Sequence, residues 1–166
     1  MKGLQVVFFF ILFSLIPTLT YAKDYDHYAE RCEPIREEVQ EILVQDGVSE
    51  DYFFLLVAEN HCTTKKSSAG AVGYWQMLPS TARENGCDDP EDLVCETHAA
   101  ANYLKKLEVK CGKENVILCW HDGGSNFLRH GKVASKAAKG LDWMYRHFKK
   151  TFYASEWAGY SENEEG

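Results

Sequence analysis

The 166-residue sequence lacks an excess of positive charge: 18 Lys and Arg residues stand against 25 Asp and Glu residues, and the formal net charge is −7. Nucleic acid is therefore not expected as a partner, because binding to phosphates needs clustered positive charge. No stretch alternates apolar and polar residues with a period of two, so a sheet contributes little to the predicted fold. The sequence also has no internal repeat and no linker-like segment, which favours one domain.

Beyond the N-terminus, the sequence has no apolar run that could cross a membrane. Residues 1–22 hold one Lys, an apolar run and a Thr-Tyr-Ala end, the layout of a secretory signal peptide cleaved after Ala22. An uncleaved anchor is the alternative, but the run from Leu4 to Pro17 is shorter than the roughly 20 residues that span a bilayer. We expect a secreted or periplasmic protein without membrane contact after cleavage, with one domain over residues 23–159 and an acidic, flexible tail over 160–166.

The sequence also lacks the Cys-x-x-Cys and His-x-x-x-His spacings that are typical of zinc sites. We therefore expect disulfides rather than the alternative, zinc, and neither a metal nor a cofactor. An even number of cysteines in an exported chain favours disulfides, and the six are Cys32, Cys62, Cys87, Cys95, Cys111 and Cys119. We favour Cys87 with Cys95, because they bracket an Asp-Asp-Pro turn, and leave the pairing of the other four open.

The sequence does contain helical periodicity. Apolar stripes and capping residues predict helices over residues 25–45, 49–59, 97–109, 116–121 and 141–152, and another from Trp75 or Pro79 to Asn85. The second helix is apolar on nearly all sides, which places it in the middle of the fold. Gly70 and Gly73 interrupt the next stretch, so residues 63–74 are predicted to form a loop. The predicted fold class is mainly α.

Glu59 is the first candidate for chemistry. It follows seven consecutive apolar or aromatic residues, from Tyr52 to Ala58. Desolvation disfavours the charged carboxylate, so a Glu in this environment has a raised pKa and keeps its proton near neutral pH. A general acid that acts on a glycosidic oxygen needs this property. The alternative is an exposed Glu at a helix end.

A longer pattern follows Glu59. Residues 67–82 read SSAGAVGYWQMLPSTA and match Ser-x-x-Gly-Ala-x-Gly-x-x-Gln-x-x-Pro-x-Thr-Ala in order, and residues 97–104 and 120–124 match two later motifs more weakly. This arrangement resembles the lytic transglycosylases of the soluble (SLT) type and the goose-type lysozymes. The resemblance implies a single lysozyme-like domain, which the disulfides would stabilise, with Glu59 as its catalytic acid.

The resemblance also implies a substrate and a reaction. Family members cleave the β-1,4 bond between N-acetylmuramic acid and N-acetylglucosamine in peptidoglycan, and lytic transglycosylases form 1,6-anhydro ends with a single catalytic Glu. Ser67 would then contact the acetamido group of the substrate, and Gln76 and Met77 would line the sugar cleft. Tyr74 offers an aromatic face for a sugar ring. Glycan strands are the expected partner, and we expect a monomer.

The later family motif Ala-Tyr-Asn-x-Gly falls on Trp120 to Gly124, and two departures from it matter: its Tyr and Asn are replaced by His121 and Asp122. His121 either hydrogen-bonds Glu59 or the substrate, or merely fills space under the cleft. A second carboxylate from Asp122 near Glu59 would raise the Glu59 pKa further and position a water, which would favour hydrolysis as in a lysozyme. An inactive glycan-binding module and a preference for deacetylated peptidoglycan, suggested by the acidic balance, are further alternatives.

Overall fold

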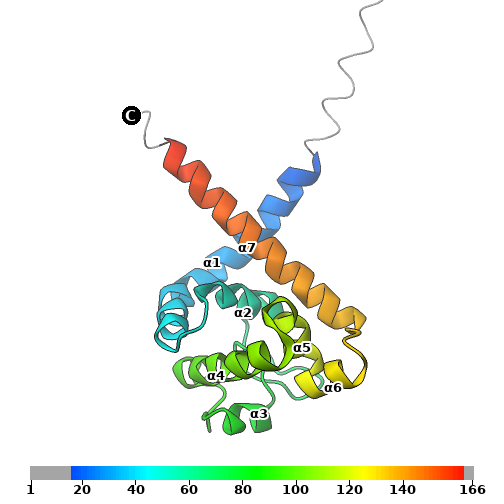
Figure 1. Cartoon of the computed structure of the whole chain (residues 1–166). Coiled ribbons are helices and arrows are strands. Elements are labelled where there is room, and N and C mark those ends of the chain that lie inside the picture. Colours follow the sequence, from blue (N-terminus) through cyan, green and yellow to red (C-terminus); the bar gives the residue numbers. More distant parts are fainter. Residues whose placement is uncertain (1–15, 163–166) are drawn as a thin grey trace, which may run out of the picture.

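The structure is a computed structural model that describes the backbone of residues 16–162 and the side chains of residues 28 and 31–154 (Figure 1). Its elements are α1 (Ile16–Gln45), η1 (Glu50–Tyr52), α2 (Phe53–Asn60), α3 (Pro79–Glu84), α4 (Leu93–Cys111), η2 (Lys113–Asn115), α5 (Val116–Asp122), α6 (Gly124–Arg129) and α7 (Lys136–Glu162). Among the described residues, strand-like pairing is limited to one antiparallel bridge between Val72 and Met77. The prediction of a mainly α fold is confirmed.

The two long helices, α1 and α7, cross above the short helices that form the rest of the domain (Figure 1). Helix α2 lies beneath this crossing and contacts both long helices. All its side chains from Phe53 to Ala58 are buried, which confirms the prediction of a central apolar helix. Because α2 is enclosed along its length, Glu59 is the first of its side chains to leave the core.

The predicted helices are present with shifted ends. Helix α4 begins at Leu93 rather than at residue 97, because the Asp92 carboxylate accepts a hydrogen bond from the Cys95 backbone N–H at 2.7 Å and caps an earlier turn. Helix α3 begins at Pro79 and not at Trp75, since proline suits the first position of a helix. The outer helices, α1 and α7, are both longer than the predicted ranges 25–45 and 141–152.

Helix α6 was not predicted, because its Gly-Gly start is typical of a turn. Gly123 has φ +75° and reverses the chain after α5. A Cβ on Gly124 would lie 3.0 Å from the Lys110 side chain and 3.1 Å from that of Leu107, so any larger residue would require these side chains of α4 to shift by a few tenths of an ångström. Phe127, which is 1% exposed, then anchors α6 in the core.

Three disulfides fasten the helices together: Cys32–Cys62, Cys87–Cys95 and Cys111–Cys119. The Cys87–Cys95 pair favoured from the sequence closes the loop between α3 and α4. The Cys32–Cys62 pair joins α1 to the residues directly after α2, across a sequence separation of 30. A link of this length stabilises a fold by about 3 kcal/mol, and this one holds the end of α2 on which Glu59 lies.

Part of the predicted signal peptide lies outside the described residues: residues 1–15 are not described, and residues 16–22 belong to α1. Of the predicted tail, residues 163–166 are also outside, and residues 160–162 end α7. None of the helices in the described range is apolar over a length that could span a bilayer. The cleavage site and the domain boundaries stay predictions.

Candidate active site

A cleft of about 510 Å³ opens beside the C-terminal end of α2. Six of the residues singled out from the sequence line it: Glu59, Ser67, Gln76, Met77, His121 and Asp122. The others are Ser68, Ala69, Ala71, Leu78, Thr81, Tyr103, Trp120, Gly123 and Asn126. The cleft thus collects the end of α2, the loop over residues 67–78, Thr81 of α3, Tyr103 of α4 and the α5–α6 junction. The structure does not bring Tyr74 into this cleft.

Glu59 lies in the last turn of α2, mostly buried but open to the cleft. Burial raises the pKa of its carboxyl to about 7, despite a hydrogen bond from Trp120 and the charge of His121, which both lower it. A carboxyl with this pKa is protonated in a large fraction of molecules at neutral pH. Glu59 therefore has the protonation state that a general acid needs.

Trp120 is the partner of Glu59 that the sequence analysis missed. Its indole Nε1–H donates to Glu59 Oε1 at 2.8 Å. The ring is 8% exposed and packs against Tyr103 and Trp75, with ring centroids 5.3 and 5.9 Å away. This packing fixes the indole, and with it the Glu59 carboxyl. The family pattern has Ala at the position of Trp120, so the substitution was the available signal.

The loop on the other side of the cleft is held by its own polar side chains. Ser67 Oγ accepts from the Ala71 backbone N–H at 3.0 Å, which leaves its hydroxyl hydrogen available for a ligand. The Gln76 amide donates to the backbone oxygens of Gly73 at 2.8 Å and Lys65 at 3.1 Å. Gln76 has φ +50°, and this left-handed turn is braced by its own side chain. Gln76 thus shapes the cleft as well as lining it.

A second buried carboxyl, Glu96 of α4, supports this loop from behind. Glu96 is 0% exposed, and its two oxygens accept from the backbone N–H groups of Tyr74 at 2.8 Å and Trp75 at 2.9 Å. Burial raises its pKa to about 8, although the backbone N–H groups of Trp75, Tyr74 and Met77 lower it. Glu96 lines no part of the cleft. Its position in an Ala-rich helix did not indicate this structural role in the sequence.

The contact between α4 and the loop depends on Gly73. Its φ is +74°, and a Cβ at this position would lie 2.2 Å from the Pro90 backbone oxygen and 2.4 Å from Glu96 Oε2. Any other residue would push the loop away from Glu96. Trp75, whose indole N–H donates to Thr97 Oγ1 at 3.0 Å, is 0% exposed and belongs to the core. Tyr74 takes part through its backbone.

Asp122 does not contribute to the rise of the Glu59 pKa that the sequence suggested. Its Oδ2 accepts from the Ser135 backbone N–H at 2.7 Å, and its Oδ1 accepts from the Ser135 hydroxyl at 2.6 Å and lies 3.1 Å from His121 Nδ1. Burial raises the Asp122 pKa, but these hydrogen bonds outweigh it and hold the pKa below its usual value. The rise of the Glu59 pKa comes from burial and not from a second carboxylate.

His121 lies in the cleft but contributes no hydrogen bond to Glu59 among the described residues; that bond comes from Trp120. With Asp122 ionised, the His121 Nδ1–H donates to Asp122 Oδ1. Ser135 in turn accepts from the Ala138 backbone N–H at 3.0 Å and caps α7. Asp122 therefore links the floor of the cleft to the start of α7.

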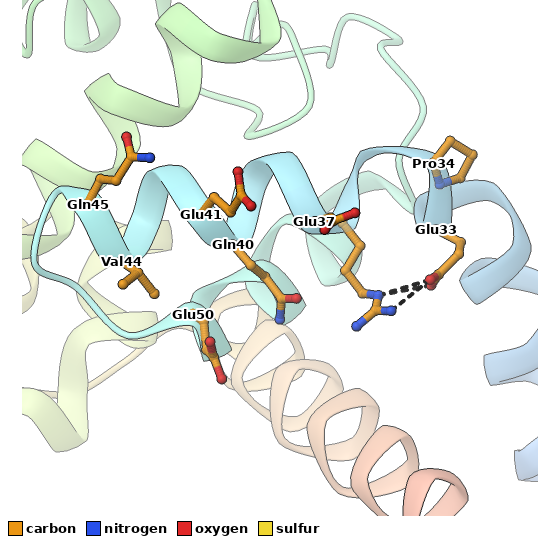
Figure 2. Close-up of a pocket in the computed structure, with 9 residues that line it drawn as sticks. Glu33, Pro34, Glu37, Gln40, Glu41, Val44, Gln45 and Glu50 are labelled. Carbon is orange, nitrogen blue, oxygen red and sulfur yellow. Dashed lines mark hydrogen bonds and ion pairs between the residues drawn. The ribbon is translucent and has the colours of Figure 1, made fainter. Parts of the chain in front are cut away.

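A larger groove of about 780 Å³ runs along α1 (Figure 2). Its carboxylates, from Glu33, Glu37, Glu41 and Glu50, are exposed, and Glu33 is paired with Arg36 at 2.8 Å. It shares no lining residue with the cleft, and it offers neither a buried acid nor an aromatic ring. Part of the negative charge of the chain therefore lies along α1, away from Glu59.

In the part of the chain that the structure describes, no group of three or more His, Cys, Asp or Glu side chains is arranged to hold a metal ion.

An all-helical domain with one mostly buried carboxyl in a cleft is the arrangement of lysozyme-like domains, which cut polysaccharides by acid catalysis. The family model of the transglycosylase SLT domain matches residues 46–144, more than half of the chain. The chain therefore belongs to the transglycosylase SLT domain family, which generally comprises lytic transglycosylases acting on peptidoglycan glycan strands. Comparisons with curated proteins and with solved structures gave no match.

Proposed function

We propose that this protein is a lytic transglycosylase that cleaves the β-1,4 bond between N-acetylmuramic acid and N-acetylglucosamine, with Glu59 as its only acid and base. The observation that carries the proposal is the environment of Glu59: a mostly buried carboxyl with a pKa of about 7 in a cleft. The other acid that lines the cleft, Asp122, has both oxygens engaged with Ser135 and is poorly placed to activate a water.

The reaction has two steps with one proton donor. Protonated Glu59 donates to the glycosidic oxygen as the C1–O bond breaks, and the carbonyl oxygen of the muramic acetamido group bonds to C1. The Glu59 carboxylate then removes the proton of the C6 hydroxyl, O6 bonds to C1, and the acetamido group is released. The products are a 1,6-anhydromuramyl end and a free N-acetylglucosamine hydroxyl, without consumption of water.

The cleft offers groups for both steps. The Ser67 hydroxyl can donate to the acetamido group, because its oxygen already accepts from Ala71. Trp120 favours the ionised form of Glu59 through its N–H, which helps after the first proton transfer. Gln76 and Met77 form the opposite wall. We also propose that the protein is exported, because three disulfides need an oxidising compartment.

Hydrolysis is the second candidate, since Asp122 lines the same cleft as Glu59. Mass spectrometry of digested cell walls separates the two reactions, because an anhydro end and a reducing end differ by one water. Anhydro ends would support the transglycosylase, and reducing ends alone would identify a lysozyme. Glycan binding without any cleavage would instead favour an inactive binding module.

The net negative charge suggested a preference for deacetylated, cationic peptidoglycan, but the position of the carboxylates supports this preference only weakly. The exposed carboxylates of the α1 groove do not line the cleft. Rates on cell walls before and after chemical re-acetylation test the preference, and equal rates would exclude it.

A further inference from the structure

A separate hollow of about 530 Å³ is lined by residues of η1, η2, α5 and α7. We call it the tyrosine–lysine hollow, and its lining residues are Tyr52, Lys113, Glu114, Ile117, Tyr145, Arg146, Lys149, Lys150 and Tyr153. None of these residues lines the cleft. Tyr52 directly precedes α2 and Ile117 lies at the start of α5, whereas Glu59 and Trp120 lie near the far ends of these helices. The hollow and the cleft are therefore two depressions at opposite ends of α2 and α5.

The charged side chains that line this hollow are mainly cationic, although the net charge of the chain is −7. Four Lys and Arg residues stand against one carboxylate, that of Glu114. Two of the four cations are paired within the protein: Arg146 with Asp142 at 2.9 Å, and Lys149 with Asp51. The charges of these two cations are therefore largely balanced by acids of the same chain.

The other two cations, Lys113 of η2 and Lys150 of α7, have no such partner. Both are exposed, and neither takes part in an ion pair among the residues whose side chains are described. The lining carboxylate, Glu114, is exposed and accepts from the side-chain amide of Asn115 at 3.0 Å. The two lysines come from different elements, so a ligand in the hollow can meet one ammonium group from each.

Tyrosine rings supply most of the apolar surface of the hollow. Tyr52 is 6% exposed and stacks on half-buried Tyr145, with ring centroids 6.4 Å apart. The Tyr52 hydroxyl donates to Glu108 at 2.8 Å, and the Tyr153 hydroxyl donates to Asp51 at 2.6 Å. These bonds satisfy both acids from inside the protein. The Tyr145 hydroxyl has no hydrogen-bond partner among the described residues, so it is available to a ligand.

This lining suits a ligand that combines a polar ring with a negative charge. The volume of the hollow falls in the range of about 300–1,000 Å³ that is typical of sites for small molecules. Tyrosine rings and the aliphatic stems of lysines offer apolar surface beside polar groups. Sugar hydroxyls both donate and accept, as do the groups on this lining. A carboxylate on the sugar would bond to the unpaired lysines, and such charge-assisted bonds are the strong ones.

We propose that the tyrosine–lysine hollow binds an acidic sugar, that is, a pyranose ring that carries a carboxylate. The inference goes beyond the proposed function, because the hollow shares no lining residue with the cleft and its binding requires no bond cleavage. Two sources offer this chemistry: a muramic acid whose lactyl carboxylate carries no peptide, and a uronic acid unit of another polysaccharide. Binding there would hold the protein on an acidic polymer while the cleft stays open.

NMR titration of the protein with three probes separates the ring from the charge. N-acetylmuramic acid carries both, N-acetylglucosamine carries the ring alone, and acetate carries the charge alone. The backbone amide signals of Lys113, Tyr145 and Lys150 report on the hollow, and those of Gln76 and His121 report on the cleft. We expect saturable shifts at the hollow with N-acetylmuramic acid and not with the other two probes.

Glucuronic acid, titrated in the same way, distinguishes the two sources, because the acid that binds more tightly identifies the kind of polymer. Shifts confined to the cleft would overturn the proposal. So would acetate or N-acetylglucosamine that binds the hollow as tightly as N-acetylmuramic acid.

The variant Lys113→Gln/Lys150→Gln removes both unpaired charges. We expect its affinity for N-acetylmuramic acid at the hollow to fall about tenfold, because two exposed cations no longer attract the carboxylate. The matched control is Lys136→Gln/Lys139→Gln, which makes the same change at two exposed lysines of α7 that do not line the hollow. It should bind as wild type does. Equal affinities of the two double variants would contradict the proposed site.

A third variant, Tyr145→Phe, tests the ring side of the hollow. It keeps the aromatic ring and loses the hydroxyl, so the affinity for N-acetylmuramic acid should fall about threefold, the effect of one hydrogen bond. The urea midpoint should not change, because this hydroxyl has no hydrogen-bond partner among the described residues. Unchanged affinity would show that the sugar does not reach Tyr145 and would contradict this placement of the ring.

Discussion

Two glutamates of raised pKa differ in what surrounds them: Glu59 lines the cleft, and Glu96 is fully buried behind the loop that forms one of its walls. Burial raises the pKa of both, to about 7 for Glu59 and about 8 for Glu96. Glu59 has one hydrogen-bond donor, Trp120, and opens into the cleft. Glu96 is sealed, and its oxygens are occupied by the backbone of the loop over residues 73–77.

The comparison teaches that a raised pKa alone does not identify a catalytic acid. Perturbed titration arises from desolvation in structural and in functional carboxyls alike. What separates Glu59 is access: its proton can reach a ligand in the cleft, whereas Glu96 uses its hydrogen-bonding capacity within the protein. Each prediction below changes one of these two environments and leaves the other intact.

The largest effect should come from removing the accessible acid. In Glu59→Gln the side chain keeps its size but cannot donate a proton, so we expect the rate of peptidoglycan cleavage to fall about a thousandfold. Turnover on purified cell walls measures the loss. The same substitution at Glu41, an exposed residue of the α1 groove, is the control and should leave the rate unchanged. Full activity of Glu59→Gln would rule out Glu59 as the acid.

The sealed carboxyl should matter first for stability. Glu96→Ala leaves the buried backbone N–H groups of Tyr74 and Trp75 without an acceptor, so the free energy of unfolding should fall by about 3 kcal/mol. Urea denaturation measures this change. Glu96→Gln keeps one amide oxygen and should lose less. An unchanged urea midpoint in Glu96→Ala would mean that the loop does not depend on this carboxyl.

The pH dependence of stability should separate the two acids again. The Glu59 pKa rises on folding from 4.5 to about 7, so between these pH values the unfolded chain has released a proton that the folded chain still holds. Wild-type stability therefore falls as pH rises through this window. Glu59→Gln lacks this titration, and its stability relative to wild type should rise by about 3 kcal/mol from pH 4 to pH 8.

The matched comparison for that experiment is Glu96→Gln, which also removes a carboxyl of raised pKa but loses an acceptor for a buried N–H. By the same linkage its stability relative to wild type should also rise with pH, up to about pH 8, but from a lower value at pH 4, because a buried N–H has lost its acceptor. Urea unfolding at several pH values measures both variants. A relative stability of Glu59→Gln that stays flat with pH would show that burial does not raise the Glu59 pKa.

The environment of Glu59 was largely predictable from the sequence, whereas that of Glu96 was not. The apolar run before Glu59 and the motif after it marked a helix end beside a cleft, because both signals are local in sequence. Glu96 acquires its role only when α4 packs behind a loop some 20 residues earlier, a contact that Gly73 permits. Nothing in its neighbours along the chain indicates this.

The same limit applies to Asp122. The sequence suggested that this carboxylate would raise the Glu59 pKa, but the side chain turns to Ser135, which only the fold brings to it. Trp120 shows the converse: it occupies a small-residue position of the family motif, and the structure uses it to hold Glu59. Departures from the family pattern thus indicated that α5 is important for the site, but they did not indicate which hydrogen bonds its side chains form.

The smallest effect should come from that Trp120 contact. Its N–H lowers the Glu59 pKa by favouring the ionised carboxylate, so Trp120→Phe should raise this pKa further. Because the free enzyme is active with Glu59 protonated, the fall of kcat/KM at high pH should move upward by about half a pH unit to one unit. The control is Trp143→Phe, which changes an exposed indole on α7 that does not line the cleft and should leave the profile in place. A high-pH limb that stays in place in Trp120→Phe would mean that the indole only fills space beside Glu59.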